Sequence, residues 1–277
     1  MIRNECCLVN LRRLIGKLNK SIVKYDITLL SASVSFFIIW AAIPMIYLMI
    51  QLLITSSLVP TLRLMNYLHD HVPDFIYSYI DQFFLSSTVF DGFVLVTFIL
   101  IMLWGASMAF NGIMQTAEII YHENRIRSPF VTRLISLIVT LGFIVVFILL
   151  IGVSFFTNDF LNETLVDVPL ALVIYNYIKF LGFPTIVFIL LIFVLTFIVP
   201  FRVKFKTQFY GAMFITVGWY VFSALFLIYI SDLANYQSRF GPFSSVIALF
   251  IWIFVLSYIL HLGIIINAIT YRKKIQD

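Results

Sequence analysis

The sequence predicts an all-α, polytopic membrane protein: a bundle of six transmembrane helices with short interfacial amphipathic helices. Hydrophobic residues make up 62% of the 277 residues and charged residues 11%, whereas ordinary soluble domains have about half and a quarter. Six long apolar runs contain no charged residue. Because lipid offers the backbone no hydrogen-bond partner, runs of this kind must be helical.

The charged segments between the runs alternate in sign, and this alternation predicts the orientation. All of the 18 Lys and Arg residues except Arg63, Lys179 and Arg239 lie in the N-terminal segment, in the second and fourth segments between runs, or in the tail. Positive residues resist translocation, so those segments are predicted to be cytoplasmic. The expected location is the cell (plasma) membrane, with multiple passes and both termini in the cytoplasm.

The first element is a basic amphipathic segment at 1–26, predicted to be cytoplasmic. Its apolar stripe comprises Leu8, Leu11, Ile15, Leu18 and Ile22. The opposite side carries Arg13, Lys17, Lys20 and Lys24, which are expected to contact anionic lipid headgroups. The alternative is a helix packed on the inner end of the bundle. Membrane lipids are therefore the expected partners and nucleic acid is not, while homo-oligomer formation is left open.

The six-helix transmembrane domain is expected to cover 27–270, because a helix needs about 20 residues to cross the bilayer core. Its spans are 27–55, 92–112, 134–156, 181–199, 209–230 and 243–268. Residues 271–277 form a basic cytoplasmic tail. Between the first two spans, Val72-Pro73-Asp74 is typical of a helix start and predicts a short helix on the outer surface. Residues 170–180 are either a second surface helix or an early start of the fourth span.

Two prolines are predicted to break helices, because proline removes a backbone hydrogen-bond donor. Pro44 lies in the first span and Pro184 in the fourth. Breaks at matching places in two halves occur in transporters built from inverted repeats. No residue-level similarity joins the two halves, so unrelated prolines are the simpler interpretation.

Polar residues within and beside the runs are the candidate functional residues. The set predicted to line a cavity comprises Ser107, Asn111, Gln115, Glu118, Ser257, His261 and Asn267. Such groups tend to face a bundle interior or a water-filled cavity. They line a vestibule open to the cytoplasm in one interpretation and hydrogen-bond neighbouring helices in the other. No acidic or basic residue lies within a run, which argues against an ion-coupled pump.

The sequence predicts neither an enzyme nor a cofactor. His69-Asp70-His71 with Asp74 is similar to part of a metallo-hydrolase signature, but a zinc site needs about three or four ligands. A solvated acidic loop is the better interpretation. No phosphate-binding loop or nucleophile elbow is present in the sequence. Cys6 and Cys7 are adjacent and predicted to be cytoplasmic, so a structural disulfide is not expected.

Several motifs follow one another in order along the chain. They are Ser35-Phe36-Phe37 with Pro44, Leu103-Trp104-Gly105-Ala106-Ser107, the basic step from Arg127 to Arg133, Val199-Pro200 with Arg202, Asn235-Tyr236, and Gly263 through Asn267. In these motifs the chain resembles the YihY/BrkB family of bacterial inner-membrane proteins. Ile265 stands where the family often has glutamate.

The resemblance implies a role in envelope integrity, with export or flipping of a lipid-like amphiphile as the mechanism expected first. The alternative is a non-transporting membrane scaffold for envelope machinery. An enzyme comes third. The ribonuclease label once given to relatives is not supported, because metal ligands are missing and the polar surface is too small for RNA.

Overall fold

The structure is a computed structural model, and it describes residues 16–56, 69, 77, 92–122, 128, 130–142, 144, 169–199, 201, 203–232 and 243–276. Helices account for nearly all of these residues, and no strand occurs among them. The predicted all-α class is therefore confirmed for the described part. The predicted outer-surface helix at Val72-Pro73-Asp74 lies outside the described residues.

Five long helices form the body of the protein. They are α2 (Ile27–Ser56), α5 (Gly92–His122), α7 (Pro169–Ile198), α8 (Phe205–Asp232) and α10 (Phe243–Gln276). Shorter helices cover residues 16–24 and Phe130–Gly142.

Four helical segments are long and apolar enough to cross a membrane. They are Ile27–Leu48, Gly92–Tyr121, Phe205–Ile230 and Val246–Arg272, and they correspond to the first, second, fifth and sixth predicted spans. The described apolar segments at the third and fourth spans are Phe130–Gly142 and Pro184–Ile198, which are shorter. A membrane protein with apolar helices is thus supported, while the six-span arrangement stays a prediction.

Several helices extend beyond their predicted spans. Helix α5 continues to His122 instead of ending at 112, and α7 begins at Pro169 instead of 181. Residues 170–180 therefore belong to the same helix as the fourth predicted span. Helix α8 begins at Phe205 instead of 209, and α10 continues to Gln276 instead of ending at 268. Neither predicted break interrupts its helix, because α2 continues through Pro44 and α7 through Pro184. Transmembrane helices tolerate proline where neighbouring groups satisfy the freed backbone carbonyls.

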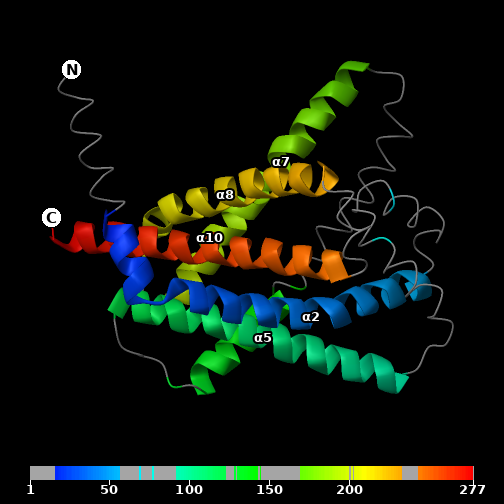
Figure 1. Cartoon of the computed structure of the whole chain (residues 1–277), viewed down its shortest axis with the longest axis horizontal. Helices are drawn as coiled ribbons and strands as arrows, with labels where there is room; N and C mark the ends of the chain where they lie inside the picture. Colours follow the sequence, from blue (N-terminus) through cyan, green and yellow to red (C-terminus); the bar gives the residue numbers. More distant parts are fainter. Residues whose placement is uncertain are drawn as a thin grey trace.

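Helices α2, α5, α8 and α10 run back and forth along the long axis of the molecule, whereas α7 crosses them obliquely (Figure 1). The first turns of α2 and α8 and the last turns of α5 and α10 lie at one end, called here the terminal end. Helix α2 packs against both α5 and α10, α10 packs against α8, and α8 packs against α7. Helix α10 thus lies between α2 and α8, and it also contacts α5, which touches α7.

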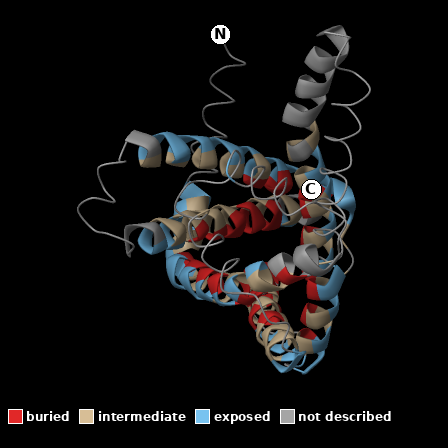
Figure 2. Ribbon diagram, turned by 90° about the vertical axis from the view of Figure 1, so that its right-hand side faces the viewer, coloured by how far each residue is buried: buried red, intermediate tan, exposed pale blue. Residues whose placement is uncertain are grey.

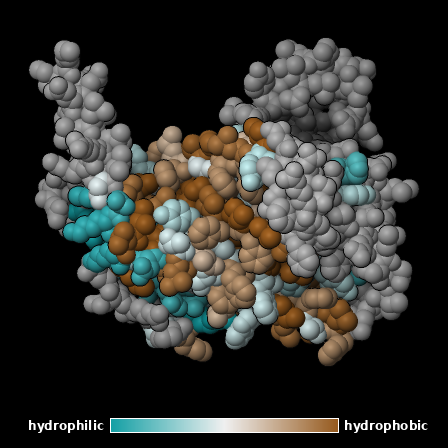
Figure 3. All heavy atoms as spheres, in the orientation of Figure 1, coloured by the Kyte–Doolittle hydropathy of each residue, from teal (hydrophilic) through white to brown (hydrophobic). Residues whose placement is uncertain are grey.

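Buried side chains concentrate toward the terminal end. The core includes Val34 of α2, Met114 of α5, Leu195 of α7, Ile215 of α8 and Ile264 of α10, and Figure 2 shows these buried faces turned toward one another. Large apolar side chains remain exposed along the rest of the helices, and hydrophobic residues cover much of the described surface in Figure 3. An apolar exterior is what a bundle surrounded by lipid requires.

The 16–24 helix meets α2 at a sharp turn. Asp26 has a φ of 46°, a left-handed conformation that Asp tolerates better than most residues. Leu18 and Ile22 pack against the core, whereas the side chains of Lys17 and Lys20 are exposed. The described part of the apolar stripe therefore contacts the bundle, as the alternative interpretation predicts, while Leu8, Leu11 and Ile15 lie outside the described residues. Lys24 is also exposed, Arg13 lies outside the described residues, and headgroup contact stays a prediction.

The arrangement suggests a direct test of the predicted orientation. Single cysteines replacing His122 and Lys204, in a chain whose Cys6 and Cys7 are changed to serine, should react with membrane-impermeant maleimide only after cells are opened. Cysteines replacing Asp74, Asp159 and Asp232 should react in intact spheroplasts, because the basic segments stay inside. Labelling of position 204 from outside would contradict the orientation.

Candidate functional site

The predicted cavity-lining residues lie at buried or half-buried positions. On α5, Ser107 and Glu118 are buried, whereas Asn111 and Gln115 are half-buried. On α10, Ser257, His261 and Asn267 are all buried. The α10 residues and Ser107 contact different neighbouring helices, so they form separate polar groups. Whether any of them lines a water-filled path stays a prediction.

Glu118 corrects one expectation from the sequence. Its side chain is only 1% exposed, because α5 extends beyond the predicted end of the second span and carries this residue into the bundle. The guanidinium of Arg133 is also partly buried and stacks over the Trp104 ring, 4.3 Å from its centroid. The expected absence of charged residues from the interior was wrong, and the argument against ion coupling loses its basis.

The first polar group, called here the His261 cluster, consists of Ser31, Ser35, Ser257 and His261. Ser35 Oγ donates to the Ser31 carbonyl, and Ser31 Oγ lies 3.2 Å from His261 Nδ1 across the α2–α10 contact. His261 Nδ1 also lies 2.7 Å from the Ser257 carbonyl oxygen. His261 Nε2 and Ser257 Oγ are buried and have no hydrogen-bond partner among the described residues. The cluster therefore keeps hydrogen-bonding capacity that this part of the chain does not use.

The second polar group, called here the Asn267 network, joins α5, α8 and α10 near the terminal end. Asn267 Oδ1 accepts a hydrogen bond from the Gly211 backbone nitrogen at 2.7 Å, and Asn267 Nδ2 donates to Gln208 Oε1 at 2.8 Å. Gln208 Nε2 in turn donates to the Tyr121 hydroxyl at 3.3 Å. Unlike the His261 cluster, Asn267 has partners for both ends of its amide.

Two glycines allow α8 and α10 to approach closely beside this network. A Cβ atom on Gly211 would collide with the Gly263 carbonyl oxygen and the Asn267 side chain. A Cβ atom on Gly263 would collide with Ile215 and lie 2.9 Å from the Gly211 carbonyl oxygen. Small residues of this kind let transmembrane helices pack backbone to backbone.

Further contacts close the terminal end. Arg272 Nη2 of α10 donates to the Ile120 carbonyl at the end of α5, at 2.6 Å. The rings of Tyr121, Phe201 and Tyr271 form a cluster with centroids 5.2 to 5.9 Å apart. The described residues at this end thus pack closely against one another.

Sequence reasoning missed Gln208 and Ser136. Gln208 precedes the predicted fifth span by one residue, and Ser136, whose Oγ lies 3.4 Å from Ser107 Oγ, is an isolated serine in the predicted third span. The sequence signal for Gln208 was its position three residues before Gly211, which places both residues on one side of a helix. In the structure that side approaches α10.

The search for a metal or cofactor site gives no candidate in the described part. No three His, Cys, Asp or Glu residues gather there as a metal site would require. Of the weak His69-Asp70-His71 and Asp74 motif, only His69 is described, and its ring packs against Tyr77. The other three residues of the motif lie outside the described residues.

The chain was compared with known proteins. A profile of the family described as Virulence factor BrkB matches residues 19–277. The chain is 27% identical over 183 residues to YfkH of Bacillus subtilis (strain 168), whose name describes it as ribonuclease-like. The match covers 63% of this chain and 65% of YfkH. No solved structure matches. The family match covers nearly the whole chain, so this protein belongs to the Virulence factor BrkB family of membrane proteins.

Proposed function

We propose that this protein moves a lipid-like amphiphile across the cell membrane, by export or flipping, and thereby maintains the cell envelope. The observation that supports the proposal is the His261 cluster. Ser257 Oγ and His261 Nε2 are buried and find no hydrogen-bond partner in the part of the chain that the structure describes. Both belong to the segment Val246–Arg272, which is long and apolar enough to span the membrane. A buried polar atom without a partner costs about 1–3 kcal/mol.

A ligand that forms hydrogen bonds with these two atoms would offset this cost. Polar residues inside membrane segments often mark a substrate path. The Ser257 hydroxyl can donate a hydrogen bond, and His261 Nε2 can accept one, because Nδ1 carries the proton that is donated to the Ser257 carbonyl oxygen. Together they match the ester carbonyls and hydroxyls of a lipid headgroup region. The packed terminal end favours entry of this amphiphile from the bilayer and not from the cytoplasm.

A scaffold for envelope machinery is the second candidate. The Asn267 network and the close contact at Gly211 favour it, since satisfied polar groups and tight packing make a rigid bundle. We do not extend the ribonuclease-like name of YfkH to this chain, because the two share 27% identity over only part of their lengths.

Lipid movement can be measured directly. The purified full-length protein, reconstituted into liposomes with trace fluorescent phospholipid, should expose inner-leaflet lipid to dithionite faster than protein-free liposomes do. Anionic and zwitterionic phospholipids should be tested in parallel, together with the lipid composition of deletion and wild-type cells. Rates equal to those of empty liposomes for every lipid, with unchanged lipids in deletion cells, would favour the scaffold.

A further inference from the structure

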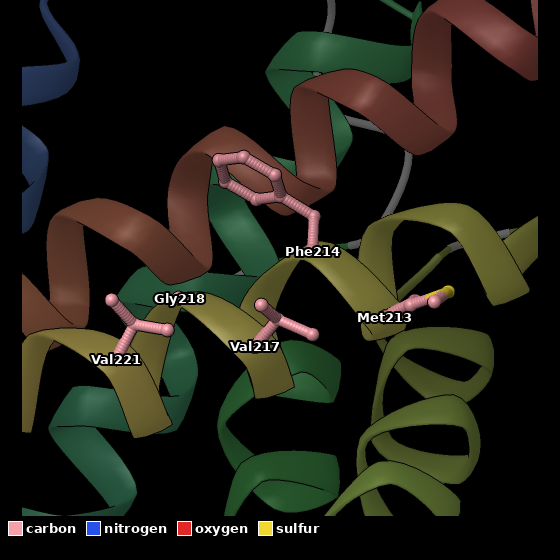
Figure 4. Close-up of a pocket in the computed structure, with 5 residues that line it drawn as sticks. All are labelled: Met213, Phe214, Val217, Gly218 and Val221. Atoms are coloured by element: carbon pink, nitrogen blue, oxygen red, sulfur yellow. The ribbon is translucent and has the colours of Figure 1, made fainter.

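Two apolar grooves lie on membrane-spanning helices of the described part. The larger groove, about 410 Å³, follows one side of α8 and is lined by Met213, Phe214, Val217, Gly218 and Val221 (Figure 4). The smaller groove, about 260 Å³, lies between α2 and α10. Its lining residues are Ala32, Ser35, Phe36, Phe250, Ile251 and Phe254.

The two grooves differ in what lies behind them. In the α8 groove, the backbone at Gly218 lies against the apolar side chain of Ile259 on α10. In the α2–α10 groove, Ser35 belongs both to the lining and to the His261 cluster. Ser35 bonds the Ser31 carbonyl, and Ser31 Oγ contacts His261 Nδ1. Of these two grooves, only the smaller therefore has a residue of the His261 cluster in its lining.

We propose that the α2–α10 groove binds one acyl chain of a membrane lipid and holds that lipid beside the His261 cluster. This inference rests on the proposed movement of an amphiphile and names the site at which the amphiphile enters. The groove lies between the spans Ile27–Leu48 and Val246–Arg272, so it opens on the hydrocarbon of the bilayer.

The chemistry of the lining selects a hydrocarbon chain. Phe36, Phe250 and Ile251 are between 41% and 50% exposed and present apolar surface to the lipid. The hydroxyl of Ser35 already bonds its own helix, so the lining offers little to a headgroup, which would lose its hydrogen bonds there. Binding in a concave site gains dispersion contacts on several sides, which a chain on a convex helix surface lacks.

Photo-crosslinking tests the site in the full-length protein. Liposomes containing the protein and a trace of phospholipid with a diazirine on its acyl chain are irradiated, and labelled peptides are identified by mass spectrometry. Labelling should concentrate on residues 32–36 and 250–254. Ala32→Trp, which places an indole in the groove from an exposed position, should lose most of this labelling.

Matched variants separate a blocked groove from a general change. Ala224→Trp alters an exposed alanine on α8, and Val217→Trp fills the α8 groove; both should keep the labelling of 32–36. Ile251→Trp fills the α2–α10 groove from the other helix and should reproduce the effect of Ala32→Trp. Variants are compared only when their thermal unfolding in detergent matches that of the parent. Because the groove is filled from either helix, the test can still be made if one of the two groove variants is destabilised.

Each outcome bears on the inference. Labelling spread evenly over the lipid-facing surface, or unchanged in both groove variants, would show ordinary surrounding lipid and overturn the site. Crosslinks between two protein copies at this groove would show a partner helix and overturn it as well. Labelling without dithionite-detected lipid movement would keep the site and reject transport, whereas lipid movement without this labelling would reject only the site.

Discussion

Replacing Gly211 with alanine is expected to destabilise the protein strongly. A Cβ atom at this position would collide with the Gly263 carbonyl oxygen and the Asn267 side chain. A backbone oxygen cannot rotate away, so α8 and α10 must separate. Overpacking of this kind typically costs about 1–3 kcal/mol, and separation would also weaken the hydrogen bond from Gly211 to Asn267.

The measurement is thermal unfolding of the purified protein, followed by size-exclusion chromatography after heating. Gly211→Ala should lower the apparent Tm and the membrane abundance together. Gly263→Ala should have a smaller effect, because the added Cβ atom lies farther from the facing backbone oxygen, at 2.9 Å from the Gly211 carbonyl, than a Cβ atom on Gly211 lies from the Gly263 carbonyl. Gly182→Ala is the control, since a Cβ atom there meets nothing within 4 Å. An unchanged Tm for Gly211→Ala would contradict the close approach of α8 and α10.

Asn267→Leu and Ser257→Ala should separate structural bracing from lipid handling. Asn267 makes hydrogen bonds to Gly211 and Gln208, and each bond between membrane helices contributes about 0.6 to 1.7 kcal/mol. Asn267→Leu should therefore lower stability by about 2 kcal/mol, and function should fall with it. Ser257 Oγ has no hydrogen-bond partner within the described ranges, so Ser257→Ala removes an unsatisfied atom and should not lower stability.

The informative quantity is the ratio of lipid movement to folded protein. Ser257→Ala should lower the rate of lipid movement per folded molecule, with a Tm equal to or above that of the parent. Asn267→Leu should instead lower the Tm, with the loss of function following the loss of stability. If Ser257→Ala keeps full activity in liposomes and full complementation of a deletion strain, the His261 cluster has no role in lipid handling.

Much of the fold was predictable because lipid imposes few choices on a chain. Uncharged runs long enough to cross the bilayer must be helical, and α2, α5, α8 and α10 confirm four of them. Helix ends were less predictable. Helix α5 passes its predicted end at 112 because Gln115 and Glu118 interrupt hydropathy but not helix formation.

The candidate site was predictable only in part. The polar residues of the last apolar run, Ser257, His261 and Asn267, were predicted to face the interior, and they are buried. Their polarity could not say which helix each would meet. Gln208 was missed because a polar residue at the edge of an apolar run looks like the end of a membrane span. Its hydrogen bond with Asn267, which shows its role, is visible only in the structure.

The sequence by itself determined the membrane class, the helical secondary structure and the family, since each depends on composition and on the local order of residues. Only the tertiary structure decided that Ser31 meets His261, that Gly211 lies against Gly263, and that Glu118 is buried. These contacts join residues far apart in the chain. Hydropathy gives every apolar helix in lipid a similar score, so the pairing of helices depends on the shapes and hydrogen bonds of their facing side chains.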